Sequence, residues 1–146
     1  GFVGRGLRFF GTVEILVHSE LATVWEFWTN PKHITQWLHA SDDWECPYAE
    51  NVVQIGGKFL SRMGAKDGST SFDFNGEYTD VILCKKLAYT IEGGRTVTVL
   101  FKEVESGVLI TESFEIETIN PEEHQRDGWQ AILENFKKYT EQSAKK

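Results

Sequence analysis

The sequence predicts an α+β fold in which a curved antiparallel sheet wraps around one long C-terminal helix. Three observations lead to this prediction: a helical apolar stripe near the C-terminus, a period of two through the middle of the chain, and two short helical segments separated by a proline. A chain of 146 residues is long enough to bury one core without disulfides or metals. We therefore expect a single domain over residues 1–146, with residues 1–11 flexible or partly ordered and a frayed tail at 141–146.

The first part of the chain reads as a strand followed by a bent pair of helices. Apolar and polar residues alternate over residues 12–17, which is typical of a half-buried strand. Residues 21–28 (LATVWEFW) carry their apolar side chains at helical spacing, and Ser19 is the expected N-cap. Pro31 ends this helix because the residue before a proline is disfavoured in the α region. A second short helix, with Trp37 on its apolar face, is expected after the proline.

Between residues 42 and 118 the period of the apolar residues changes to two, which indicates consecutive antiparallel strands. Glycine-containing turns at 67–68, 93–94 and 106–107 separate the alternating segments. Clean alternation means that one face of the sheet is covered and the other is wet. The strands expected from this period are residues 58–63, 70–81, 86–92, 96–104 and 108–117.

The C-terminal segment is expected to form the helix that covers the apolar face. Pro121 and the two glutamates that follow it are typical of a helix start. The stretch GWQAILENFKKY (128–139) then puts Trp129, Leu133 and Phe136 on one side. About 20 helical residues span roughly 30 Å, which is enough to cross a whole sheet. We therefore expect this helix to lie across the concave face.

Four stretches, in this order along the chain, resemble one family. They are VWEFWTNPKHITQWL (24–38), IGGKFLSRM (55–63), FNGEYTDV (74–81) with the following KLAYTI, and GWQAILENFKKY (128–139). They look like the AHSA-like branch, named after the activator of the heat-shock-protein-90 ATPase, of the SRPBCC or START-like superfamily. This resemblance implies a helix-grip fold. It also implies a hydrophobic cavity between the C-terminal helix and the sheet, and it assigns no reaction.

The aromatic residues that face inward are either packed core or the wall of such a cavity, and periodicity does not separate the two. If the cavity implied by the resemblance exists, we expect it to hold a small lipid-like or aromatic ligand. Tyr78 and Trp129 are the strongest candidates for ligand contact, because they lie in the GEY and GW stretches that carry the resemblance. The predicted ligand-contacting residues are Trp28, Trp37, Phe59, Phe72, Phe74, Tyr78, Tyr89, Glu112, Trp129, Leu133 and Phe136.

Glu112 stands out because its strand parity directs a carboxylate toward the apolar side. An unpaired buried carboxylate is costly, and burial raises its pKa. The functional interpretation is a polar anchor for a ligand or an acid/base group. The alternatives are a position at the mouth of the fold, a pairing with Arg62, Arg95 or a histidine, or a β-bulge that reverses the parity.

These observations give three hypotheses for function. The first is a non-enzymatic carrier or sensor of a small hydrophobic molecule. The second is a co-chaperone or stress-response module that works through its outer surface, with a chaperone as partner and a filled core. The third is a cyclase-like or hydrolytic enzyme that uses Glu112 and tyrosines as acid/base groups. We favour the non-enzymatic interpretation and assign no catalytic residue.

Other classes of function are disfavoured. The net charge of −7 and the absence of a basic stripe argue against nucleic acid as a partner. No stretch approaches the roughly 18 apolar residues of a membrane helix, so we expect no membrane insertion. Histidine and cysteine spacings match no metal site, and no nucleotide-binding motif is present, so we expect no metal and no cofactor. Without a secretory signal pattern at its start, we expect the chain to be cytoplasmic, as a monomer or homodimer.

Overall fold

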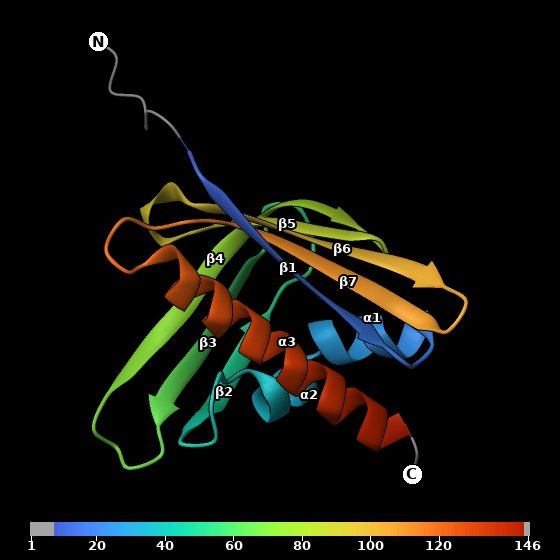
Figure 1. The fold of residues 1–146 in the computed structure, drawn as a ribbon, viewed down its shortest axis with the longest axis horizontal. Helices are drawn as coiled ribbons and strands as arrows, with labels where there is room; N and C mark the ends of the chain where they lie inside the picture. The colour runs from blue at the N-terminus through green and yellow to red at the C-terminus, as the bar shows by residue number, and fades with distance from the viewer. Residues whose placement is uncertain (1–7, 145–146) are drawn as a thin grey trace.

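The computed structural model describes residues 8–144 as seven strands and three α-helices, with a short 3₁₀ turn at Glu92–Gly94 (Figure 1). In chain order the elements are β1 (Phe10–Val17), α1 (Leu21–Thr29), α2 (Pro31–Trp37), β2 (Trp44–Asn51), β3 (Lys58–Ala65), β4 (Ser71–Ile82), β5 (Lys86–Ile91), β6 (Thr96–Val104), β7 (Gly107–Glu115) and α3 (Glu122–Ala144).

The strands form one antiparallel sheet in the order β1-β7-β6-β5-β4-β3-β2. The sheet curves, and α3 runs diagonally across its concave side, while α1 and α2 lie next to the C-terminal half of α3 at one end of the sheet (Figure 1). The long connection from β1 to β2 contains α1 and α2, so these helices link the two edge strands of the sheet. This arrangement confirms the predicted α+β fold, with a curved sheet wrapped around the C-terminal helix.

The break between α1 and α2 follows the sequence prediction, but the start of α1 does not. Asn30 adopts an extended conformation, and its side-chain Oδ1 accepts a hydrogen bond from Lys32 N at 2.9 Å, with Pro31 at the first position of α2. The prediction of Ser19 as N-cap is wrong. Ser19 N instead donates to Val17 O at 3.0 Å in the turn after β1, and Glu20 takes the cap position without a side-chain cap bond.

Strand β2 has no counterpart among the strand ranges predicted from the period of two. It lies at the edge of the sheet and contains Pro47. Its register with β3 shifts between Glu45 and Tyr48, so the proline falls in an irregularity that needs no ladder hydrogen bond. An edge strand with a bulge loses the clean alternation that the prediction relied on.

The structure describes ordered backbone close to both ends of the chain. Phe10 and Gly11 already belong to β1, within the segment expected to be flexible or partly ordered. Residues 141–144 continue α3 rather than fraying, and the Glu141 carboxylate accepts bonds from His18 N and Lys137 Nζ, both at 2.8 Å. Residues 1–7 and 145–146 lie outside the described part of the chain.

Helix α3 is fixed to one side of the sheet and to the helix pair. Gln130 Nε2 donates to Glu14 O on β1 at 3.2 Å, and Lys137 Nζ donates to Leu16 O. Asn135 Nδ2 donates to Trp37 O at 3.3 Å and to His39 O at 3.0 Å, just after α2. These bonds hold α3 against β1 and α2. The concave face of β3, β4 and β5 therefore lies opposite the N-terminal half of α3, with space between them.

Candidate functional site

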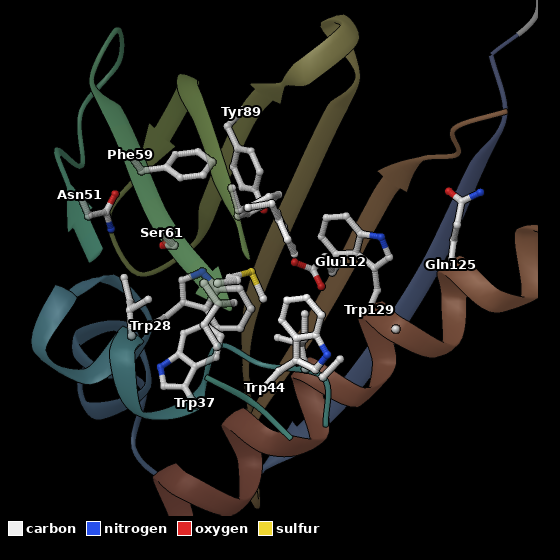
Figure 2. A pocket seen from close by; sticks show the side chains of 18 of the residues that line it. Trp28, Trp37, Trp44, Asn51, Phe59, Ser61, Tyr89, Glu112, Gln125 and Trp129 are labelled. Carbon is white, nitrogen blue, oxygen red and sulfur yellow. The ribbon is translucent and has the colours of Figure 1, made fainter. Parts of the chain in front are cut away.

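A cavity of about 410 Å³ occupies this space. Its wall is mostly apolar, and side chains from α1, α2, α3 and five strands contribute to it (Figure 2). The lining residues are Trp28, Ile34, Trp37, Leu38, Ala40, Ser41, Trp44, Glu50, Asn51, Phe59, Ser61, Met63, Phe72, Phe74, Tyr78, Tyr89, Glu112, His124, Gln125, Gly128, Trp129 and Ile132.

Contacts between rings fix the aromatic part of the wall. Trp129 stacks on Phe114 with ring centroids 4.7 Å apart and planes 9° apart. Across the cavity, the Phe59 ring lies 4.9 Å from that of Tyr89 and meets it edge-on. Trp28 and Trp37 form a third ring pair, 4.9 Å apart, at the α1–α2 end. Because each of these rings packs against another ring, the aromatic part of the wall is held in place by the protein itself.

The mouth of the cavity is more exposed than its interior. Phe72 keeps 50% of its surface exposed, and Trp44 lies 5.9 Å from it between ring centroids. Glu50 and His124 are the other exposed titratable residues of the lining, and the Glu50 carboxylate accepts a hydrogen bond from the Tyr48 hydroxyl at 2.6 Å. The exposed part of the lining therefore contains aromatic rings and two titratable side chains, while the interior is apolar apart from a few groups.

Glu112 is the charged residue in the interior of the cavity. It is only 3% exposed, and it faces Val13 on β1 and Val99 on β6 in an uninterrupted register. Within residues 8–144 its carboxyl makes no hydrogen bond and no ion pair. Burial raises its pKa to about 8. Figure 2 shows the carboxyl directed into the space bounded by Trp44, Tyr89 and Trp129.

The alternatives for Glu112 are wrong. Its 3% exposure rules out a position at the mouth, and among residues 8–144 no histidine pairs with its carboxyl. The parity is not reversed, because the register of β7 with both of its neighbours is regular at this position. Arg62 instead pairs with Asp73, at 3.1 Å. Arg95 donates to the backbone oxygen of Glu92 at 3.4 Å. A carboxyl therefore points into the apolar interior, as the strand parity predicted.

The other polar groups of the interior are uncharged. The Tyr78 hydroxyl donates to Asn51 Oδ1 at 2.6 Å, and Asn51 Nδ2 donates to Thr29 O at 2.8 Å, so this chain of bonds ties β4 to α1. Burial raises the pKa of Tyr78 to about 12. Burial, with the neighbouring Glu112 carboxylate, raises the pKa of Tyr89 well above its ordinary value. Both phenols are therefore neutral at physiological pH.

Nine of the eleven residues predicted to contact a ligand line this cavity, and two do not. Leu133 and Phe136 are completely buried in the core and do not reach the cavity, so their expected place on its wall is corrected. Their part of α3 packs against the helix pair, with the Phe136 ring 4.9 Å from that of Trp37. The nine on the wall are Trp28, Trp37, Phe59, Phe72, Phe74, Tyr78, Tyr89, Glu112 and Trp129.

The prediction missed several lining residues for different reasons. Ser61 and Met63 share the inward parity of Phe59 on β3, so the period of two was a signal that could have found them. Trp44 lies on β2, the strand that the period did not reveal. Gly128 has no side chain to contribute to an apolar stripe, yet it lines the cavity from α3.

The described residues offer little for other kinds of chemistry. Between residues 8 and 144, no group of three His, Cys, Asp or Glu side chains is placed to hold a metal ion. Cys46 is buried, and burial raises the pKa of its thiol, which makes it a poor nucleophile. In the same part of the chain, no helix has both the length and the apolar character to cross a bilayer. The arrangement suits the enclosure of an apolar molecule with a polar group.

A curved antiparallel sheet that grips a C-terminal helix, with a cavity between them, defines a helix-grip protein of the SRPBCC type. Comparison with known families agrees, because the family model described as "Activator of Hsp90 ATPase homolog 1-like protein" matches residues 18–141. The chain belongs to this AHSA1 family. No curated protein matches it.

Solved structures of similar proteins support the same assignment. The chain is 36% identical to an AHSA1-like protein from Aeromonas hydrophila, with a TM-score of 0.89 over 94% of this chain and 96% of that one. It is 45% identical to a protein from Cytophaga hutchinsonii, with a TM-score of 0.78 over 92% and 93% of the two chains. A protein from Nitrosomonas europaea shares the fold at 16% identity, with a TM-score of 0.80 over 94% and 97%.

Proposed function

We propose that this protein is a non-enzymatic carrier or sensor of a small hydrophobic molecule, lipid-like or aromatic, held between α3 and the sheet. The observation that carries the proposal is the cavity of about 410 Å³ with its mostly apolar wall. Cavities of roughly 300–1,000 Å³ with apolar walls and a few polar groups are typical small-molecule sites. Ser41 on the wall donates to the Asp43 carboxylate at 2.6 Å, but both residues are exposed in the loop before β2. Among the described residues of the interior, no serine or cysteine is hydrogen-bonded to a base, which favours binding over catalysis.

The composition of α3 supports a cavity that stays open. Gly128 is in the second turn of the helix, and a Cβ built there would meet nothing within 4 Å. Glycine in a helix interior costs about 1 kcal/mol relative to alanine, so local helix stability does not explain it. The adjacent residue Trp129 and, one turn further on, Ile132 line the same cavity. A missing side chain on this turn leaves room that a larger residue would fill.

The test is to fill that room. The neutral fluorescent probe N-phenyl-1-naphthylamine is titrated into the wild type and two variants, Gly128→Ala and Gly128→Leu. The wild type and Gly128→Ala should bind the probe, whereas Gly128→Leu should lose at least tenfold in affinity while it remains folded by circular dichroism. Native mass spectrometry of the purified protein should also reveal a co-purifying small molecule. A bare mass together with unchanged probe binding in Gly128→Leu would refute the carrier function.

A second candidate function is that of a co-chaperone, and the description of the matched family favours it. Such a function would use the outer surface and not the cavity. It predicts that the protein binds the 90 kDa heat-shock chaperone and changes its ATPase rate, and that Gly128→Leu does so as well as the wild type. An unchanged ATPase rate at saturating protein, without measurable binding, would reject this candidate.

We also propose a cytoplasmic setting for either function. The two cysteines, Cys46 and Cys84, are both free. Free thiols suit a reducing compartment. Trapping with an alkylating reagent in intact cells, followed by mass spectrometry, should recover both residues in the thiol form. Recovery of oxidised Cys84, the more accessible of the two, would contradict this setting.

A further inference from the structure

The charged groups that line the cavity are almost all acidic. Glu112 lies in the interior and Glu50 at the mouth, and His124 is the one other titratable group of the lining besides the two tyrosines. Among the residues that the structure describes, neither a lysine nor an arginine lines the cavity. A ligand with a carboxylate or phosphate group would leave water and find no positive charge, which is a costly transfer.

Glu112 has the features expected of a carboxyl that pairs with a bound ligand. It is 97% buried, it is directed into the cavity, and its neighbours on both adjacent strands are valines. The described residues supply neither a hydrogen bond nor an ion pair to its carboxyl. A buried carboxylate is strongly stabilised when an opposite charge comes close. A cationic group on a ligand would supply that charge.

The aromatic rings around this carboxyl also favour a cation. Trp44, Tyr89 and Trp129 border the space into which Glu112 points (Figure 2). The faces of such rings attract ammonium groups, more strongly where water is excluded. We propose that the ligand is an organic cation, an apolar body that carries one ammonium group seated against the Glu112 carboxylate. This inference rests on the proposed carrier function and narrows it to one class of ligand.

Binding of a cation should depend on pH through Glu112. Since burial puts the pKa of this carboxyl at about 8, roughly one tenth of it is ionised at pH 7 and nine tenths at pH 9. A ligand with a permanent positive charge favours the ionised form, so its affinity should rise about tenfold between pH 7 and pH 9. The other titratable groups that share the cavity with Glu112 are Tyr78, Tyr89, Glu50 and His124.

The experiment compares three probes with the same phenylbutyl body. They are (4-phenylbutyl)trimethylammonium, neutral 5-phenylpentanol and anionic 5-phenylpentanoate, and their affinities are measured by calorimetry at pH 7 and pH 9. At pH 9 the ammonium probe should bind at least tenfold more tightly than the alcohol, and the carboxylate should bind most weakly. The alcohol should show little change with pH, because its charge does not vary and it has no ion pair to form.

Two glutamine variants locate the effect. Glu112→Gln should bring the affinity of the ammonium probe down to that of the alcohol and remove its dependence on pH, while the alcohol still binds. Glu103→Gln removes the same charge from an exposed position on β6 outside the cavity, and it should change the affinity of the ammonium probe by less than about threefold, because solvent screens an exposed group. Thermal unfolding of each variant checks that the fold is intact.

The outcomes separate this inference from the carrier function. Equal affinity of the ammonium and alcohol probes for the wild type, or a preference for the cation that survives in Glu112→Gln, would overturn the cation inference and leave the carrier function standing. Failure of all three probes and of N-phenyl-1-naphthylamine to bind would overturn both. A preference for the carboxylate probe would reverse the assigned ligand charge.

Discussion

Replacement of Glu112 by glutamine should stabilise the ligand-free protein, and the gain should grow with pH. Glutamine keeps the shape of the protonated carboxyl but cannot ionise. The Glu112 carboxyl is 3% exposed, and burial raises its pKa from 4.5 to about 8. Below the unfolded pKa of about 4.5, Glu112 is protonated in both the folded and the unfolded state and costs no stability. As the pH rises from about 4.5 to about 8, the unfolded state loses this proton while the folded state keeps it, so the free energy of unfolding falls.

The size of the effect follows from the two pKa values. Each pKa unit corresponds to about 1.4 kcal/mol, so the ionisable side chain lowers the free energy of unfolding by about 1 kcal/mol at pH 5, about 3 kcal/mol at pH 7 and about 5 kcal/mol at pH 9. Glu112→Gln should recover these amounts at each pH. A gain of about 3 kcal/mol is large for one substitution, because whole domains are stable by only about 5–15 kcal/mol.

Urea denaturation at pH 5, 7 and 9, followed by tryptophan fluorescence, measures the difference between the variant and the wild type. Other carboxyls titrate in the same range, so the difference between the two proteins is compared rather than either curve alone. Glu103→Gln removes the same charge from an exposed position on β6, and it should change stability by less than about 0.5 kcal/mol at every pH. A Glu112→Gln variant that is less stable than the wild type, or a gain that does not vary with pH, would refute the reasoning.

Four further substitutions test other parts of the structure. Trp129→Ala should lower the free energy of unfolding by about 2 kcal/mol and Phe136→Ala by about 4 kcal/mol, because only Phe136 is completely enclosed. Urea denaturation measures both values, and an equal loss of stability in the two variants would show that Trp129 is packed as densely as Phe136. Cys84→Gly should add about 1 kcal/mol and raise the Tm, since Cys84 has a φ of 60°; a lower Tm would contradict this strain. Gly76→Ala should cost about 2 kcal/mol, because a Cβ would lie 2.5 Å from Thr90 O and 2.8 Å from the Phe59 ring; unchanged stability would show that the strands move apart easily.

The parts of the fold that depend on local geometry could be predicted from the sequence. Alternation along a strand follows from the pleat, so the inward faces of Phe59, Tyr78, Tyr89 and Glu112 could be assigned without any tertiary information. The same is true of the break at Pro31, which comes from the sterics of one residue. Strand β2 could not be found in this way, because Pro47 and a register shift remove its alternation.

The division of α3 between core and cavity could not be predicted. Trp129, Leu133 and Phe136 share one helical face, and the spacing treats them alike. The tilt of the helix separates them. Hydrogen bonds from Asn135 to the backbone oxygens after α2 draw the C-terminal half of α3 onto the helix pair, where Phe136 is enclosed. These bonds join residues about a hundred positions apart, so no local pattern reports them.

The inward residues of β7 show how this tilt gives Glu112 its place in the cavity. Val108 and Ile110 are completely buried, and Phe114 is covered by the stacked Trp129 ring. Of the inward β7 residues, Glu112 alone reaches the cavity. An uncharged side chain there would suit the fold better, because the unpaired carboxyl costs stability near neutral pH. Packing therefore does not account for a glutamate at this position. An ion pair with a cationic ligand would account for it, because that ion pair would offset the free energy that burial of the carboxyl costs.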